Sequence, residues 1–150
     1  MSNRPSRSQT DRASALALEV RTLIGKFRRK LRDQTGHEDF TSSQASVLLR
    51  LEKDGPATAS NLARAESMRA QSMSAVIAPL EAAGLVGGAP DPNDGRQTIL
   101  SLTQKCRELI HERRAAKQDW LTRMILAKLS AQEQEALAAA VEILARLVED

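Results

Sequence analysis

Residues 67–103 read SMRAQSMSAVIAPLEAAGLVGGAPDPNDGRQTILSLT. The first half has apolar residues at helical spacing and ends at Gly84, a residue type that commonly terminates helices. The second half predicts two short strands, one that begins at Leu85 and one over Thr98–Leu102, joined by a polar loop. This stretch therefore predicts a helix followed directly by a β-hairpin.

The outer face of the predicted helix is small and neutral. Apolar residues recur at steps of three and four from Met73 to Leu80, which places the other residues on the opposite face. Small residues allow close approach to base edges, and glutamine and serine can hydrogen-bond them, glutamine most characteristically to adenine. A surface helix without a ligand is the alternative. The residues on this face are Gln71, Ala75, Ala78 and Ala82, with Ser72 and Ser74 at its edges.

Ser67 and Pro79 set two expectations for the same helix. The Ser67 hydroxyl can cap its first turn. Pro79 lacks the N–H that would bond the Ala75 carbonyl, which costs roughly 3 kcal/mol in a helix interior. The helix therefore either bends at Pro79 or stops short of it, and the apolar pattern that continues through Leu80 favours a bend.

The loop between the two predicted strands, Asp91–Arg96, is rich in turn-forming residues. Arg96 follows a tight turn that contains Gly95, and Asp94 is near enough in sequence to orient its guanidinium. An arginine at such a tip can enter a narrow A·T-rich minor groove. A helix for one groove and a hairpin for the other is the arrangement of a winged helix-turn-helix, whereas a surface hairpin without a ligand is the alternative.

The remainder of the chain predicts helices. Apolar residues at helical spacing indicate a long helix over about residues 11–34, after an N-terminal stretch without periodicity. The fold class is therefore mainly α, with about six helices and a small β-hairpin wing. Side chains suited to cap further helices follow at four places: Thr41 with Gln44, Thr58, Thr103, and Ser130 with Glu133.

Composition excludes several classes of protein. The 150 residues include one cysteine and two histidines, too few nitrogen and sulfur ligands for a tetrahedral zinc site, so we expect neither a metal nor a cofactor. No apolar run approaches the roughly 20 residues of a membrane span, which predicts a cytoplasmic protein without membrane contact. Aromatic residues are only 2% of the chain, which argues against stacking on single-stranded RNA.

The net charge of +3 is unevenly distributed. Residues 1–36 carry nine basic and three acidic side chains, and residues 105–128 carry seven and three. Residues 61–104, which include the predicted reading helix and hairpin, carry three and four. We therefore expect phosphate affinity to come largely from the flanking helices.

Catalysis is not predicted. His37 and His111 have no nucleophile, carboxylate pair or glycine-rich phosphate loop beside them, so no catalytic residue is assigned and the chain is not expected to be an enzyme. A helical protein-interaction module without DNA readout is a further alternative, because it would explain the near-neutral reading helix.

Cys106 and Trp120 suggest two possible sites. Cys106 lies near the start of a predicted helix beside Lys105 and Arg107, which could lower the pKa of its thiol and make the protein redox-responsive. The alternative for Cys106 is an inert small residue. Trp120 can line a ligand pocket, although a lone tryptophan on an apolar helix stripe more often belongs to a core or a dimer interface.

The order of these elements resembles the MarR family of bacterial transcriptional regulators. The resemblance covers nearly the whole chain from about residue 11, and its most specific parts are SMRAQSMSAVIAPLEAAG at residues 67–84 and GLVGGAPDPNDGRQTILSLT at residues 84–103. It implies a repressor that binds double-stranded DNA at a pseudo-palindromic operator. Such repressors are commonly relieved by a small aromatic or phenolic ligand or by cysteine oxidation.

The resemblance also implies a domain organisation and a set of site residues. Residues 1–10 are expected to be a flexible arm because they lack periodicity, not because of the resemblance. The resemblance implies that residues 11–36 and 104–150 form a helical region through which two subunits interleave as a homodimer, and that residues 37–103 form the winged helix-turn-helix. Carried over by position, the phosphate-binding residue is Arg69, the residues facing major-groove bases are Gln71, Ser72 and Ser74, and the wing tip in the minor groove consists of Asp94 and Arg96.

Three positions depart from the pattern of similar proteins. Gly87-Gly88 replaces a charged pair in the first wing strand, which lowers the charge of the wing. Ala75 stands where an arginine is frequent in the reading helix, and Pro79 is unusual there. These departures concern DNA affinity and specificity more than the fold.

Overall fold

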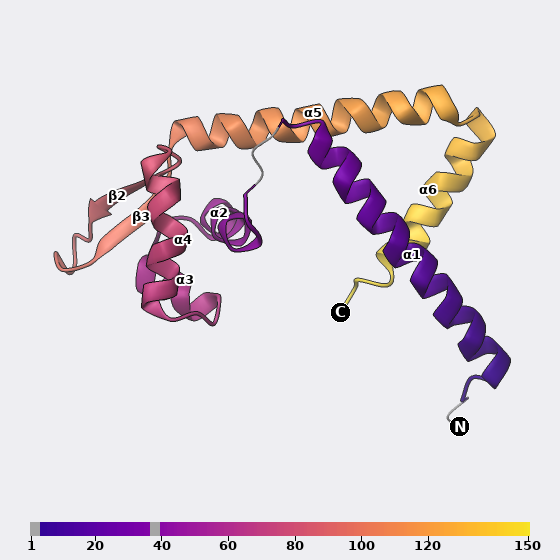
Figure 1. The fold of residues 1–150 in the computed structure, drawn as a ribbon, viewed down its shortest axis with the longest axis horizontal. Helices are drawn as coiled ribbons and strands as arrows, with labels where there is room; N and C mark the ends of the chain where they lie inside the picture. The colour runs from indigo at the N-terminus through magenta and orange to yellow at the C-terminus, as the bar shows by residue number, and fades with distance from the viewer. Residues whose placement is uncertain (1–3, 37–39) are drawn as a thin grey trace. The chain divides into compact units, whose positions relative to one another are not determined.

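A computed structural model describes residues 4–36 and 40–150, which form six helices and a three-stranded sheet (Figure 1). The predicted fold class, mainly α with a small β wing, is confirmed. In chain order the elements are α1 (Arg7–Asp33), α2 (Ser42–Asp54), β1 (Ala57–Thr58), α3 (Ala59–Ala65), α4 (Ala70–Ala82), β2 (Val86–Pro90), β3 (Thr98–Leu102), α5 (Gln104–Lys128) and α6 (Ala131–Ala145).

The described residues fall into two compact units. One contains residues 40–114, and the other contains residues 4–36 and 115–150. Helix α5 is shared, because its residues up to Arg114 belong to the first unit and the rest to the second.

The unit of residues 40–114 is built around an apolar core. Helices α2, α3 and α4 contribute side chains from the faces that the periodicity predicts, and the sheet and the start of α5 complete the core. Val47 and Met73 have no exposed surface. The buried apolar residues are Val47, Leu48, Leu51, Leu62, Ala63, Met73, Ile77, Leu80, Leu85, Val86, Leu100, Leu102 and Cys106.

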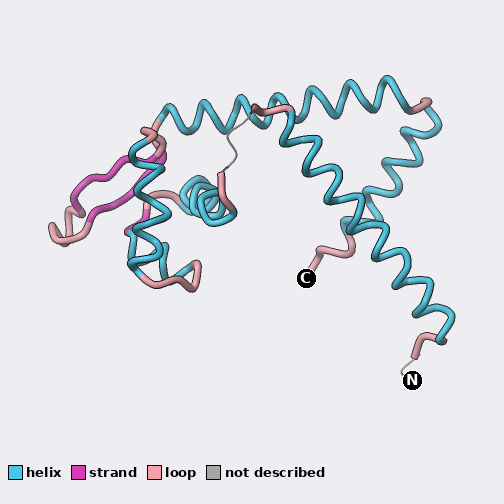
Figure 2. Tube along the Cα trace, in the orientation of Figure 1, coloured by secondary structure: helices cyan, strands magenta, loops and turns pink. Residues whose placement is uncertain are grey.

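The sheet is antiparallel, in the order β1-β3-β2. Its central residue is Leu100, which lies opposite Ala57 on one side and Gly88 on the other. Strand β2 is an edge strand, where Pro90 is tolerated because its missing N–H removes no ladder hydrogen bond from a central position. The loop Asp91–Gln97 joins β2 to β3. The hairpin formed by these two strands and the loop is here called the wing (Figure 2).

The predicted helix starts are largely confirmed. Capping boxes open α2 at Thr41 and α6 at Ser130, and Thr58 caps α3 through its hydroxyl. The Thr103 hydroxyl accepts from the Cys106 N–H at the start of α5, at 3.2 Å.

Helix α1 begins earlier than the periodicity predicts, at Arg7 rather than near residue 11. The reason is a capping box: Ser6 Oγ accepts from the Gln9 N–H at 3.2 Å, and Gln9 Oε1 accepts from the Ser6 N–H at 2.8 Å. Residues 7–10 of the expected flexible arm are therefore helical, and residues 1–3 lie outside the described part of the chain.

The expected capping role of Ser67 is wrong. Arg69 is the N-cap of α4, without a side-chain hydrogen bond, and Ser67 instead ends α3. The N–H of Ser67 bonds the Arg64 carbonyl at 3.2 Å, and the N–H of Met68 bonds the Ala63 carbonyl at 2.8 Å. These two bonds form a Schellman motif, which places Ser67 in the left-handed region at φ +53°.

Helix α4 runs as one element through Pro79 to Ala82. The alternative, a helix that stops short of the proline, is therefore excluded. The Ala75 carbonyl, which loses its bond, lies on the exposed side of the helix, where water can satisfy it. The helix ends in a second Schellman motif, in which Gly84 has φ +73° and the Leu85 N–H bonds the Leu80 carbonyl at 2.9 Å.

Helices α1 and α6 contain no buried residue. The four apolar residues that recur in phase along α6 and just beyond its end are between 38% and 83% exposed, and five large apolar side chains of α1 are likewise exposed. None of the described helices has the length and apolar character of a membrane-crossing segment. These residues are Leu137, Val141, Leu144 and Val148 on the C-terminal side, and Leu16, Leu18, Leu23, Ile24 and Phe27 in α1.

Candidate nucleic-acid interface

The outer face of α4 is exposed, as its sequence predicts. Arg69 precedes the first turn, and Gln71, Ser72 and Ser74 all lie at the surface while Met73 faces the core. The Ser74 hydroxyl donates to the Ala70 carbonyl at 3.0 Å, so its proton is engaged and its oxygen remains an acceptor. Among the described residues, no hydrogen bond engages the Gln71 or Ser72 side chain. Both are therefore available to donate to or accept from a ligand.

The start of α5 holds the C-terminal end of α4. Lys105 Nζ donates to the Ala83 carbonyl at 2.9 Å, and the Thr103 hydroxyl donates to the Gly84 carbonyl at 2.7 Å. Carbonyls at a helix C-terminus lack intrahelical partners, and a lysine beside them also complements the helix dipole. The sequence does not reveal these contacts, because they join residues about 20 positions apart.

The loop of the wing is held in a turn by hydrogen bonds of its own backbone. The Asp91 N–H bonds the Gln97 carbonyl at 2.9 Å, and the Gln97 N–H bonds the Asp94 carbonyl at 3.0 Å. The Asp91 carboxylate accepts from the Asn93 N–H at 2.9 Å, which fixes the first half of the loop. Arg96 extends from this turn as an exposed side chain.

Asp94 has a different role from the one expected. Its carboxylate accepts from the main-chain N–H of Arg96 at 3.1 Å, and within the described residues no hydrogen bond or ion pair joins it to the Arg96 guanidinium. An aspartate whose carboxylate accepts from the N–H two residues further along forms an Asx turn. This N–H is nearer to the carboxylate in the chain than the end of the long arginine side chain is. Asp94 therefore shapes the turn and does not pair with the Arg96 guanidinium.

The two wing glycines differ in how tightly they are packed. A Cβ added at Gly88 would lie 2.7 Å from Thr98 Cγ2, well inside normal contact distance. A Cβ added at Gly87 would lie 3.7 Å from Thr103 Cγ2, an ordinary contact. An alanine at Gly88 would therefore require the Thr98 side chain to move, whereas one at Gly87 would not disturb its neighbour.

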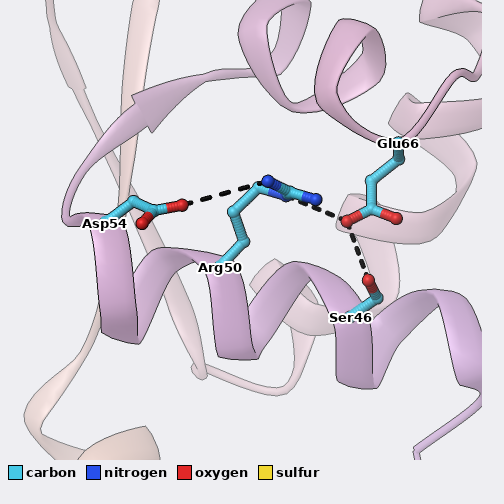
Figure 3. Close-up of polar contacts among 4 residues, drawn as sticks. All are labelled: Ser46, Arg50, Asp54 and Glu66. Atoms are coloured by element: carbon cyan, nitrogen blue, oxygen red, sulfur yellow. Dashed lines mark hydrogen bonds and ion pairs between the residues drawn. The ribbon is translucent and has the colours of Figure 1, made fainter. Parts of the chain in front are cut away.

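A polar cluster behind the helix-turn-helix was not foreseen from the sequence. Glu66, the C-cap of α3, accepts hydrogen bonds from Ser46 and Arg50 of α2, and Arg50 also lies 3.9 Å from Asp54 (Figure 3). These hydrogen bonds, first that from Ser46 and then that from Arg50, hold the pKa of Glu66 below its ordinary value. Sequence offers one weak signal, the spacing of four that places Ser46 and Arg50 on one face of α2.

Two contacts join α5 to the segment around α2. Arg114 donates two hydrogen bonds to the Glu52 carboxylate, at 2.6 and 3.1 Å. The Arg113 guanidinium lies over the Phe40 ring, 4.6 Å from its centroid, in a cation–π contact. The basic residues of α5 are thus partly engaged within their own unit.

Cys106 does not fit a redox site. It is fully buried in the core, and burial, followed by the charge of Glu52, raises the pKa of its thiol. Arg107 and Arg113 favour the thiolate, but desolvation and the charge of Glu52 outweigh them, so the alternative of a thiol with a lowered pKa is not supported.

Two of the remaining residues of interest from the sequence belong to α5. Trp120 is half-buried on α5, in the unit of residues 4–36 and 115–150. His111 is exposed on α5, and His37 lies outside the described residues.

Comparison with known proteins gives consistent matches. The model of the MarR family matches residues 40–98. The uncharacterized HTH-type transcriptional regulator Mb0904 of Mycobacterium bovis is 34% identical over 140 residues, which are 93% of this chain and 97% of that protein. The uncharacterized HTH-type transcriptional regulator ML2140 of Mycobacterium leprae is 31% identical over the same shares.

Solved structures share the fold. A putative transcriptional regulator from Pseudomonas aeruginosa superposes with a TM-score of 0.80 at 31% identity and covers 97% of this chain and 99% of its own. A MepR mutant from S. aureus, bound to an oligodeoxyribonucleotide, superposes with a TM-score of 0.69 at 21% identity and covers 89% and 98%. The chain belongs to the MarR family and is a winged helix-turn-helix, DNA-binding transcriptional regulator.

Proposed function

We propose that the protein binds a pseudo-palindromic operator as a homodimer, with α4 in the major groove and the wing in the adjacent minor groove of each half-site. One observation carries the proposal: the six residues assigned to DNA contact are all exposed and lie in one unit, on α4 with its N-cap and in the wing. They are Arg69, Gln71, Ser72, Ser74, Asp94 and Arg96.

The roles of the α4 residues follow from their chemistry. Gln71 can bond adenine through both ends of its amide, and Ser72 can donate or accept. Ser74, whose proton is used within the helix, is suited to accept from a base amino group. Arg69, at the N-cap, is suited to a phosphate contact that sets the register of the helix without reading sequence.

The wing contributes one positive charge at its tip. Because Asp94 is engaged by the Arg96 backbone, the guanidinium is left for the minor groove, where narrow A·T-rich sequence concentrates negative potential. With a near-neutral α4, Arg96 carries a large share of the electrostatic attraction at the reading surface.

Dimerisation is supported by the exposed apolar residues of α1 and α6. Leaving so many large apolar side chains in water is unfavourable by about 25 cal/mol for each Å² of apolar surface. A second copy of the chain, interleaved through α1, α5 and α6, would cover them. A dimer would also place two α4 helices on one face of a duplex, about 10 base pairs apart.

We further propose that the dimer is a repressor that a small aromatic or phenolic ligand releases from DNA. The proposal rests on the likeness to the MarR family. Trp120, the single tryptophan, provides a fluorescence signal for a screen of phenolic acids. A ligand that both changes this fluorescence and dissociates the protein from its operator supports the proposal, whereas fluorescence changes without an effect on DNA binding speak against it.

The operator itself can be found by titration. Fragments that flank the gene of this protein, labelled with a fluorophore, are titrated at two salt concentrations in the presence of unrelated competitor DNA. We expect one fragment to be preferred, with a slope of log K against log salt of about −0.9 for each phosphate contacted. A protein that binds no fragment in preference to competitor would contradict the proposal.

A protein-interaction module without DNA readout is the competing function. The near-neutral α4 face favours it, since electrostatic attraction to phosphate is weak there. Substitution of Arg96 separates the two, because a DNA reader loses affinity whereas a module of that kind is indifferent. A redox-responsive regulator based on Cys106 is disfavoured by the buried thiol and its raised pKa.

A further inference from the structure

The turn between α3 and α4 sets the direction in which α4 is presented. It consists of residues 66–69, and Arg69 and the exposed first turn of α4 follow it directly. Ser67 within this turn is the one residue other than glycine, among those described, that has a positive φ. An L-residue in the left-handed region is strained, so neighbouring contacts must hold it there.

Glu66 supplies a directional contact of this kind. One carboxylate oxygen, Oε1, accepts from the Ser46 hydroxyl at 2.7 Å and from Arg50 Nε at 3.0 Å. The Glu66 side chain is only 17% exposed, so water competes weakly for these bonds. Figure 3 shows both donors on one face of α2, reaching toward the carboxylate from two successive turns.

The opposite side of the turn is held by apolar packing. Met68 is partly buried against the core and its N–H closes the Schellman motif on Ala63. Apolar contacts fix the depth of a segment but are non-directional, whereas hydrogen bonds to a partly buried carboxylate also fix its orientation. Glu66 and Met68 therefore hold the exposed, strained residue from both of its neighbouring positions in the chain.

We propose that Glu66 is a positioning residue for DNA binding. It ties the turn to α2 and so presents Arg69, Gln71 and Ser72 in a single orientation, without contacting DNA itself. Its carboxylate faces two donors inside the protein, and a negative charge has no favourable partner on a phosphate backbone. The inference rests on the proposed operator binding and assigns a further residue to it.

The test compares two alanine substitutions with the same charge change. Glu66→Ala removes both hydrogen bonds to the turn, and Glu52→Ala on α2 removes an ion pair to α5 instead. We expect Glu66→Ala to weaken operator binding about tenfold, and to lower the salt slope by no more than about 0.9, the share of the single phosphate contact assigned to Arg69. Glu52→Ala should stay within about twofold of the parent. Parent-like affinity of Glu66→Ala, or equal losses in the two variants, would overturn the proposal.

Two further variants separate positioning from folding. Glu66→Gln keeps an acceptor oxygen, so it should recover most of the affinity that Glu66→Ala loses. If Glu66→Ala does not fold, Ser46→Ala removes one hydrogen bond only and should weaken binding by about threefold. Full affinity in Ser46→Ala, or Glu66→Gln as weak as Glu66→Ala, would contradict the assignment.

Hydrogen exchange without DNA makes the result independent of the operator. In Glu66→Ala the amides of Ser67 and Met68 should exchange about tenfold faster, while those of α5 stay as protected as in the parent. Unchanged exchange at these two amides overturns the positioning role even if DNA binding is impaired. If these amides exchange faster in Glu66→Ala but the parent protein prefers no DNA fragment, Glu66 does fix the turn between α3 and α4. The proposed operator binding would then be wrong.

Discussion

The Asp94 carboxylate bonds the main-chain N–H of Arg96, with 3.1 Å between Oδ1 and N, and leaves the arginine side chain free of it. The acid therefore acts as a turn former at the wing tip. Asp94 therefore has two properties whose effects can be tested separately by substitution: its acceptor oxygen and its negative charge.

Asp94→Asn should bind operator at least as tightly as the parent. Asparagine keeps the acceptor for the Arg96 N–H and removes a negative charge from the DNA-facing loop. Asp94→Ala removes the acceptor as well and should bind about threefold to fivefold more weakly than Asp94→Asn, because the turn loses a hydrogen bond. Anisotropy titrations of the three proteins decide this. Equal losses in Asn and Ala variants would show that the charge matters instead.

Gly88→Ala should destabilise the protein, and Gly87→Ala should not. The new Cβ at Gly88 meets Thr98 Cγ2 at 2.7 Å, whereas the one at Gly87 makes an ordinary contact. Overpacking of this kind costs about 1–3 kcal/mol, less whatever a shift of the Thr98 side chain relieves. Urea unfolding of both variants measures the difference. Adding Thr98→Ser, which deletes the clashing methyl group, should restore stability to Gly88→Ala, and failure to do so would rule out this contact as the cause.

Glu66 should make stability depend on acid pH. Its pKa in the folded protein lies below the ordinary value of 4.5, so its stabilising effect is complete above about pH 4.5 and is lost as the pH falls through the folded value. Glu66→Gln should therefore be less stable than the parent by about 1 kcal/mol at pH 7, and this difference should shrink as the pH falls below about 4.5. Urea unfolding across this range tests the sign. A difference that grows toward acid pH is the contrary result.

Val141→Asp should convert the dimer to monomer. Val141 is exposed on the apolar stripe of α6, and a charge there would be buried without a partner in a dimer. Ala139→Asp is the control, because helical spacing places it on the opposite side of α6. Sedimentation equilibrium of the three proteins gives the masses. A dimer that survives Val141→Asp would show that the stripe lies outside the interface.

Local signals in the sequence predicted most of the fold. The capping residues Thr41, Thr58 and Ser130 start helices where expected, and strand β3 has the predicted bounds. These features depend on neighbours within four residues or on alternation along one strand. The start of α1 was missed because the Ser6–Gln9 capping box lies in a stretch without apolar periodicity.

The contacts that orient the candidate site could not be predicted in the same way. Glu66 meets Ser46 across 20 residues, and Lys105 meets the end of α4 across 22. Such pairs depend on how helices pack, which periodicity does not specify. Ser67 was assigned to the wrong helix because a serine between two helices can cap the second or end the first, and the backbone bonds to α3 decide for the first.

The most direct test of DNA readout by the wing is a comparison of Arg96→Ala with Arg146→Ala. Both remove one positive charge, but Arg146 is the C-cap of α6, in the other unit. In anisotropy titrations against the preferred operator fragment, Arg96→Ala should bind about tenfold more weakly and lose preference for A·T-rich flanks, whereas Arg146→Ala should stay within about twofold of the parent. An Arg96→Ala protein that binds the operator as tightly as the parent would contradict the account.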